Sequence, residues 1–285
     1  MTRELAGPGA VGGPGESGGP GELDTPDDVA ADLREPGFLE PSALYPPRDM
    51  PDAVVLCFLP ATVRSMGERP GSQVSCELSD ILEPRPLWER EHRGRRIGWT
   101  YPSIGAPHAT MVVEELIARG VRRFVAVGSA GVLVPDLVMG HPFVVTSALR
   151  DEGTSGQYGA SGAVVEAEPL GVAACRSVLS QAGVAYAEGR TWTTDAIYRE
   201  TRSRTTRRIA QGCAVVDMEA SALQAVAKFR GASLGQLVFS ADSLAGDTWD
   251  ARAWSESGDV HEAFFWLGMD IAARLVELTE PSTGA

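Results

Sequence analysis

The sequence predicts a three-layer α/β/α domain built on a central mixed, mostly parallel sheet. Short continuous apolar runs such as 53–59 are typical of strands buried on both faces. Segments with helical periodicity follow several of these runs, and strands that alternate with helices favour an α/β architecture. The length of 285 residues, with 44% hydrophobic and 22% charged residues, suffices for one large globular domain or two small ones.

The individual strands and helices are predicted from apolar runs, periodicity and glycine breaks. Gly120 ends one helical segment, and the strand before Gly128 is expected to break into a loop there. Strands are expected at 53–59, 95–101, 124–127, 141–148, 185–192, 214–216 and 234–240. Helices are expected at 107–119, 170–181, 220–229 and 260–278, the last of them long and amphipathic.

The folded domain is expected to occupy residues 37–285, behind a glycine- and proline-rich tail of residues 1–36. Positions 7–21 read GPGAVGGPGESGGPG and offer almost nothing to bury. Such a composition cannot offset the entropy cost of ordering the chain, so the tail is predicted to be disordered.

Charge and apolar patterning narrow the possible partners. The formal net charge of −13 argues against a nucleic acid or an anionic membrane, which would require a basic face. A small anionic substrate stays compatible, because converging backbone N–H groups can bind phosphate in an acidic protein. No apolar run approaches the roughly 18 residues of a membrane span, and the N-terminus lacks the apolar core of a signal peptide. A cytoplasmic protein is therefore expected.

The cysteines and histidines carry no metal signature. The four cysteines are scattered without a Cys-x-x-Cys pair, and Cys57 and Cys213 lie in or beside apolar runs. Buried reduced thiols are therefore expected rather than disulfides. The four histidines show neither metal spacing nor the partner Ser or Cys of a triad, so no metal site and no catalytic histidine are predicted.

The most informative stretch is 215–222, where an apolar run ends in Asp217, Met218 and Glu219 and small residues follow. Burying an unpaired carboxylate is costly, so such groups at a strand end usually face a ligand or a partner. Two carboxylates around a thioether would suit a polyhydroxylated ring, with oxygens accepting from hydroxyls and sulfur on the apolar face. The alternative is that Asp217 or Glu219 caps the helix that opens at Ala220.

Gly128 and Ser129 open a loop, 128–131, at the kind of strand end where open α/β sheets bind ligands. Glycines let backbone N–H groups converge on an oxyanion, and Ser129 adds a hydroxyl donor. The loop is not a P-loop, because no Gly-Lys-Ser/Thr follows it. It is also a poor dinucleotide fingerprint, because another strand follows rather than a helix. The alternative is an ordinary tight turn.

Three further residues at strand ends or in loops are candidates. Asp242, just past the predicted strand 234–240, could serve as a general acid, or form an Asx-turn or helix cap. Arg64 follows the first strand and could bind an anion or be an ordinary solvated surface group. Tyr198 lies near a predicted loop and could stack on a base or simply pack.

Taken together, six segments in order resemble the nucleoside phosphorylase family, which contains hexameric purine nucleoside phosphorylases, uridine phosphorylases and related nucleosidases. The resemblance covers about residues 52–280. Its motifs are VVLCFLPATVR, SIGAPHATMVVEEL, FVAVGSAG, TTDAIY, VVDMEASAL and SADSL. The acid–Met–Glu–Ala segment and the Gly-Ser-Ala-Gly loop are the specific parts.

The resemblance implies roles for these residues. Glu219 would hold the ribose 2′ and 3′ hydroxyls, and Met218 would pack on the sugar. Asp242 would protonate or hydrogen-bond N7 of a purine-like base as the base leaves. The remaining roles are base contacts for Ile197 and Tyr198, and phosphate contacts for Arg64, Gly128 and Ser129. Inorganic phosphate would be a co-substrate with no further cofactor, and family sites built across subunits imply a homo-oligomer, from dimer up to hexamer.

The leading expectation is phosphorolysis of a nucleoside to a free base and a (deoxy)ribose 1-phosphate. Two departures from the family weaken the phosphate site: Pro60 supplies no N–H in place of a Gly-Asp-Pro-like turn, and Ala126 replaces the phosphorylases' arginine. Asp217 also replaces a glutamate, which shortens its reach by one methylene. The closest rival is therefore a hydrolase that uses water, and a further alternative is a nucleoside-binding protein without turnover.

Overall fold

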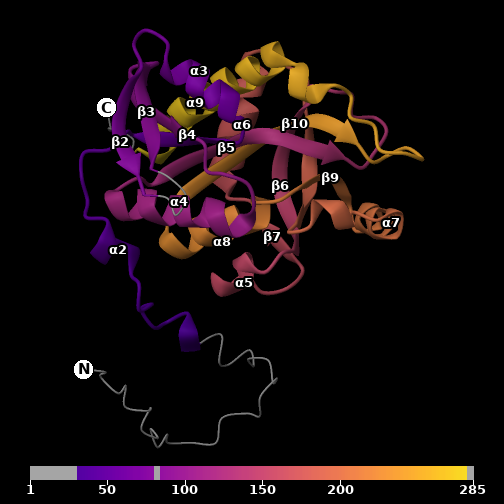
Figure 1. The fold of residues 1–285 in the computed structure, drawn as a ribbon, viewed down its shortest axis with the longest axis horizontal. Helices are drawn as coiled ribbons and strands as arrows, with labels where there is room; N and C mark the ends of the chain where they lie inside the picture. The colour runs from indigo at the N-terminus through magenta and orange to yellow at the C-terminus, as the bar shows by residue number, and fades with distance from the viewer. Residues whose placement is uncertain (1–30, 80–83, 281–285) are drawn as a thin grey trace, which may run out of the picture.

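The computed structural model describes residues 31–79 and 84–280, whose arrangement Figure 1 shows. The strands, in chain order, are β1 (Ala53–Cys57), β2 (Gln73–Leu78), β3 (Arg85–His92), β4 (Arg95–Thr100), β5 (Arg123–Val132), β6 (Pro142–Asp151), β7 (Val164–Glu166), β8 (Ala187–Thr194), β9 (Cys213–Asp217) and β10 (Ser233–Ser243). The helices are α2 (Pro41–Leu44), α3 (Pro60–Gly67), α4 (Ala106–Arg119), α5 (Thr154–Gln157), α6 (Pro169–Gln181), α7 (Arg202–Ala210), α8 (Ala220–Arg230) and α9 (Gly258–Thr279), with 3₁₀ turns η1 (Ile197–Arg199) and η2 (Trp254–Glu256).

These strands form one mixed sheet in the order β10-β6-β8-β9-β5-β1-β4-β3-β2, with β7 beside β6. Strand β10 also pairs with β5, so β5, β10, β6, β8 and β9 close into a ring. Parallel pairings join β4, β1, β5 and β10, and also β6, β8 and β9. The predicted three-layer fold with a mixed, mostly parallel sheet is confirmed, and the closed ring is a feature that the sequence did not predict.

Helices cover both faces of the open part of the sheet. Helices α3, α6 and α9 pack on one face and α4 and α8 on the other (Figure 1). Because successive strand side chains point to opposite faces, Val55 packs in the same cluster as α9 and Val54 in the same cluster as α4. The two faces are thus built from alternate residues of the same apolar runs, as expected for a strand such as β1 that is buried throughout.

Two strands extend further than the sequence predicts, and these extensions place candidate site residues inside strands rather than in loops. Strand β5 does not break at Gly128 but continues to Val132, because its backbone pairs with β10 through Gly128, Ser129 and Ala130. The tight-turn interpretation of 128–131 is therefore wrong. Strand β10 continues to Ser243, so Asp242 lies inside a strand rather than just past it.

Residues 1–30 of the predicted tail lie outside the described residues. Residues 31–36 are described and mostly exposed, with Leu33 half-buried against Gly159. The four cysteines are free and buried, as predicted. Within residues 31–79 and 84–280, no helix combines the length and the apolar character needed to cross a membrane.

Candidate active site

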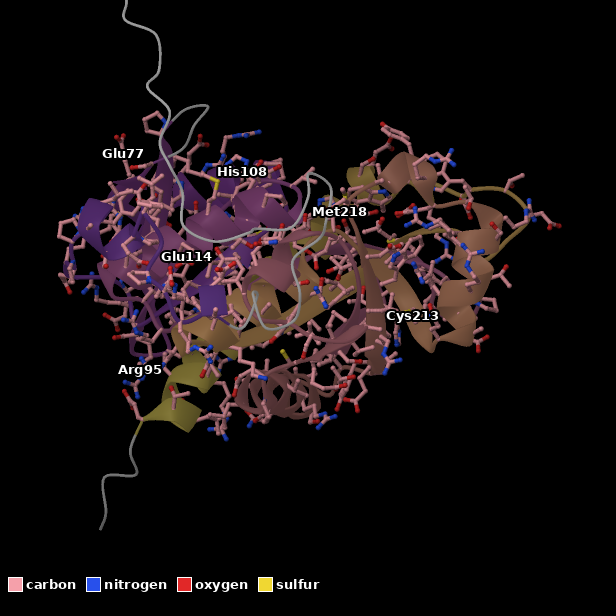
Figure 2. All side chains as sticks on the ribbon, turned by 90° about the horizontal axis from the view of Figure 1, so that it is seen from below. Glu77, Arg95, His108, Glu114, Cys213 and Met218 are labelled. Atoms are coloured by element: carbon pink, nitrogen blue, oxygen red, sulfur yellow. The ribbon has the colours of Figure 1, made fainter. Side chains whose placement is uncertain are left out.

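Two buried carboxylates lie at the junction of β9 and α8. Strand β9 ends at Asp217 and α8 begins at Ala220, so Glu219 stands one residue before the first helical turn. The exposed fractions of Asp217 and Glu219 are only 8% and 9%. Met218 lies between them in the chain, is half-buried, and is labelled near the middle of the molecule in Figure 2.

Asp217 is held by three hydrogen bonds. Its Oδ1 accepts from the Thr193 hydroxyl at 2.8 Å, and its Oδ2 accepts from the side-chain amide of Gln236 at 3.2 Å. Oδ2 also accepts from the backbone N–H of Ala220 at 2.9 Å, so Asp217 does cap α8, as the alternative interpretation proposed. Three elements of the ring, β8, β9 and β10, therefore converge on this one carboxylate.

Glu219 accepts fewer hydrogen bonds than Asp217, and its pKa is shifted further from the ordinary value. Its Oε1 accepts from the backbone N–H of Gly105 at 2.6 Å. Burial, followed by the nearby Asp217 carboxylate, raises the pKa of Glu219 to about 8. Burial also raises the pKa of Asp217 to about 6, although its hydrogen bonds oppose that shift. Near neutral pH Glu219 therefore holds its proton in the unliganded protein.

A small cavity of about 20 Å³ joins these carboxylates to the predicted glycine–serine segment. Gly128 and Ser129 line it together with Glu219. Phe58 closes one side and packs tightly on Gly128, because a Cβ built there would lie 2.9 Å from the Phe58 Cβ. The other lining residues are Ala126, Val127, Asp217, Glu219, Gln236 and Val238.

Asp242 lies farther along β10, beside Gly131. Its Oδ1 is 3.6 Å from the position that a Gly131 Cβ would take, and its Oδ2 accepts from the Trp249 indole N–H at 2.7 Å. A second acid, Glu200, interacts electrostatically with it: burial and then the Asp242 carboxylate raise the pKa of Glu200 to about 7. Asp242 thus sits in a small acidic group with an aromatic donor.

The remaining predicted site residues are exposed. Ile197 and Tyr198 lie on η1, with exposed fractions of 53% and 96%. Arg64 lies on an exposed position of α3 and does not line the small cavity, whereas the neighbouring Thr62 is buried. The structure therefore brings Gly128, Ser129 and Glu219 into one cavity and leaves Arg64 outside its lining.

Sequence reasoning missed several residues of this site. Gln236 and Thr193 sit in strands among apolar or hydroxyl neighbours, and Gly105 contributes only its backbone. Glu200 lies two residues after Tyr198, the last residue of the motif TTDAIY, so its closeness to that motif was the available signal. A buried polar residue in the apolar stretch 234–239 was the available signal for Gln236, because such a group requires a partner.

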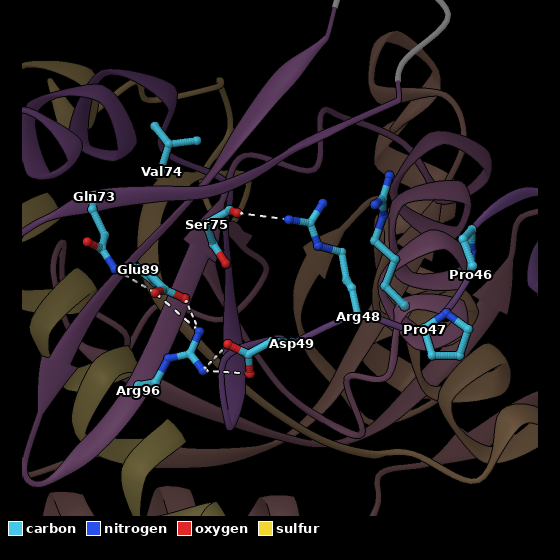
Figure 3. Close-up of a pocket in the computed structure, with 10 residues that line it drawn as sticks. Pro46, Pro47, Arg48, Asp49, Gln73, Val74, Ser75, Glu89 and Arg96 are labelled. Atoms are coloured by element: carbon cyan, nitrogen blue, oxygen red, sulfur yellow. Dashed lines mark hydrogen bonds and ion pairs between the residues drawn. The ribbon is translucent and has the colours of Figure 1, made fainter.

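A larger hollow of about 580 Å³ lies elsewhere, at the edge formed by β2 and β3 (Figure 3). Most of its charges are paired: Arg96 donates to Asp49 at 2.8 Å and to Glu89 at 2.9 Å, while Arg48 donates to the backbone oxygen of Ser75. Because these groups neutralise one another and the hollow is open, it offers a ligand little unsatisfied charge. Among the described residues no cluster of His, Cys, Asp and Glu has the arrangement of a metal site.

Comparisons with known proteins identify the family to which this three-layer α/β fold belongs. Residues 52–265 match the family model described as the Phosphorylase superfamily. The chain belongs to this family, whose characterised relatives here are nucleoside phosphorylases and a nucleosidase.

The curated relatives match only segments of this chain. A uridine phosphorylase of Thermococcus kodakarensis is 34% identical over 114 residues, which is 38% of this chain and 39% of that protein. A guanosine phosphorylase of Halorubrum lacusprofundi is 44% identical over 55 residues, covering 19% of this chain and 23% of that protein. The matched segments thus span less than half of these relatives.

Solved structures resemble the fold over most of its length. An AMP nucleosidase from Bacteroides thetaiotaomicron superposes with a TM-score of 0.66 at 18% identity, covering 81% of this chain and 90% of that one. A uridine phosphorylase from Vibrio fischeri also gives a TM-score of 0.66, at 22% identity, covering 79% of this chain and 90% of that one. At these identities the likeness establishes the fold.

Proposed function

We propose that this protein cleaves the N-glycosidic bond of a nucleoside with a purine-like base. The observation that carries the proposal is the buried Glu219 carboxyl group, which accepts from the backbone N–H of Gly105 and lines a cavity. A sugar with two adjacent hydroxyls would satisfy it. The donated hydrogen bonds would also favour its ionised form, because they stabilise negative charge.

The proposed roles follow the chemistry of the bond that breaks. Departure of the base leaves an oxocarbenium-like sugar, which the negative charge of Glu219 would stabilise. Met218 would pack against the sugar face, and Ile197 and Tyr198 would contact the base. Asp242 would donate to N7 of the leaving base, a contribution of about 10²–10⁴-fold in rate.

We infer that water is the acceptor. What supports this is the lining of the cavity beside Glu219, where the described residues include two carboxyl groups and no Arg or Lys side chain that would offset the charge of a phosphate. Pro60 lacks an N–H, Ala126 carries no charge, and Arg64 lies outside the cavity lining. The products would be a free base and a free sugar.

Phosphorolysis is the second candidate. It is favoured by the position of Gly128 and Ser129 next to Glu219 and by the names of the curated relatives, which are uridine and guanosine phosphorylases. Phosphate would then need a larger opening near Phe58 than the structure has.

A panel of purine and pyrimidine nucleosides tests the proposal. The purified protein is incubated with each nucleoside, and bases and sugars are separated by chromatography. We expect release of purine bases and slower or no release of pyrimidines. Tight nucleoside binding without release of any base would instead support a binding protein without turnover.

A further inference from the structure

Gln236 is a buried side chain with half of its amide unsatisfied. The residue is 4% exposed and sits in the middle of β10, where it lines the cavity beside Glu219 and Ser129. Its Nε2 donates to Asp217, but no hydrogen-bond partner among the described residues reaches its Oε1. Leaving a buried carbonyl oxygen without a hydrogen bond is destabilising, so we expect a donor that enters the cavity to bind this oxygen.

Asp217 fixes the orientation of this amide. A carboxylate accepts hydrogen bonds, so the NH₂ group of Gln236 must face Asp217 and the oxygen must face away from it. Asp217 is itself held by Thr193 and by the N-terminus of α8. The acceptor is therefore preorganised by three elements and does not depend on a mobile surface side chain.

We propose that Gln236 holds the attacking water of the glycosidic cleavage, accepting one of its hydrogen bonds through Oε1. This inference rests on the proposed function and names the residue that positions its nucleophile. The cavity of about 20 Å³ has room for one water, and a bound water needs two to four polar partners. Gln236, Ser129 and Glu219 line the same space, and we assign Gln236 Oε1, the Ser129 hydroxyl and the Glu219 carboxyl group as these partners.

The step balances without any other reactant. The C1′–N bond breaks, and its electron pair leaves with the base, which takes a proton from Asp242. The water oxygen forms the new bond to C1′, and the proton that it loses passes to Glu219, whose carboxylate is ionised once the sugar hydroxyls donate to it. That proton and the one lost by Asp242 then re-equilibrate with solvent, so the net reaction adds H to the base and OH to the sugar.

The first test compares Gln236→Leu with wild type on a purine nucleoside in phosphate-free buffer. Leucine keeps the bulk but removes the acceptor, so we expect kcat to fall about 10²-fold, as for a displaced reacting group, while KM stays near the wild-type value. Gln224→Leu is the matched control. Gln224 is 3% exposed on α8 and also has an unpaired amide atom, but it lies outside the cavity and bonds the Glu168 backbone.

The second test does not depend on how much of a variant folds. Cleavage is run in water–methanol mixtures, and the ratio of methyl glycoside to free sugar is measured. Gln236→Ala removes the water's acceptor and opens space, so its ratio should rise several-fold above wild type, whereas Gln224→Ala should keep the wild-type ratio.

The outcomes separate the two claims. If wild type releases no base from any nucleoside, the proposed function fails. If wild type cleaves nucleosides only when phosphate is present, or if Gln236→Ala keeps the wild-type ratio and Gln236→Leu keeps the wild-type kcat, the inference about Gln236 is overturned while glycosidic cleavage stands.

Discussion

The backbone N–H of Gly105 donates a 2.6 Å hydrogen bond to the carboxyl group of Glu219, and so ties the start of α4 to the start of α8. The backbone N–H groups of Gly105 and Met218 satisfy only part of a carboxylate's capacity to accept hydrogen bonds. Burial, together with the nearby Asp217 carboxylate, outweighs these hydrogen bonds and raises the pKa of Glu219 to about 8, so the group stays protonated at a pH where an ordinary glutamate is ionised. The hydrogen bond from Gly105 thus positions the Glu219 carboxyl group and leaves it able to accept further hydrogen bonds.

The first prediction concerns stability against pH. The folded pKa of Glu219 is about 8 against an ordinary 4.5, so between these values the folded state binds more protons than the unfolded state. The free energy of unfolding should therefore decrease as pH rises through this range, by on the order of 2–4 kcal/mol. Asp217, with a pKa of about 6, acts in the same direction.

Glu219→Gln isolates this contribution, because glutamine does not titrate yet still accepts from Gly105. Urea unfolding at pH 5 and pH 8 should show a smaller loss of stability in the variant than in wild type. Parallel profiles for the two proteins would contradict the raised pKa of Glu219.

The second prediction concerns Asp242. Asp242→Asn keeps an oxygen for the Trp249 indole but cannot supply a proton, so release of the base should slow by about 10²–10⁴-fold. Thermal unfolding should stay close to wild type. Steady-state kinetics with a purine nucleoside check this, and a wild-type rate in the variant would remove Asp242 from the mechanism.

The third prediction concerns the support of Asp217. The Thr193 hydroxyl donates to Asp217 and accepts from the backbone N–H of Ser221. Thr193→Val keeps the shape but leaves both groups short of a partner in a fully buried setting, so unfolding should become easier by about 1–3 kcal/mol. Thr206→Val, on the exposed face of α7, is the control and should change stability by less than about 0.5 kcal/mol.

The fourth prediction concerns the packing of α6 on β10. A Cβ on Gly171 would lie 2.2 Å from the backbone oxygen of Leu234, and backbone cannot move aside cheaply. Gly171→Ala should therefore lower the free energy of unfolding by at least about 1–3 kcal/mol. Gly258→Ala has open space around its new methyl group and should be nearly neutral. Equal denaturation midpoints for the two variants would argue against this packing.

The sequence predicts the apolar framework well, because buried strands such as β1 and β9 leave continuous apolar runs and helices such as α4 end at a glycine. The sequence does not predict the structure where strand pairing, rather than local composition, determines the backbone conformation. Residues 128–131 look like a turn, yet β10 extends the ladder through them. The β2–β3 pair escaped notice because β3 is rich in charged residues and β2 is a short mixture of polar and apolar ones, and α7 because its sequence RSRTTRRIA has no apolar stripe.

The residues of the candidate site also differ in whether the sequence could predict them. Glu219, Gly128 and Ser129 could be predicted from motifs, and the structure places them around one cavity. Gln236 and Gly105 could not, because Gly105 acquires its role through a contact with a residue 114 positions away, and Gln236 through a contact between β10 and β9, two strands that do not pair with each other. Such contacts leave no local pattern in the sequence.

The most direct test of the central claim is the time course of base and sugar release from purine nucleosides by the purified protein in phosphate-free buffer, beside Asp242→Asn. The account predicts equal amounts of free base and free sugar from wild type, and at least about a 10²-fold slower release from the variant. No release of base by wild type, with or without added phosphate, would contradict the claim that this site cleaves nucleosides.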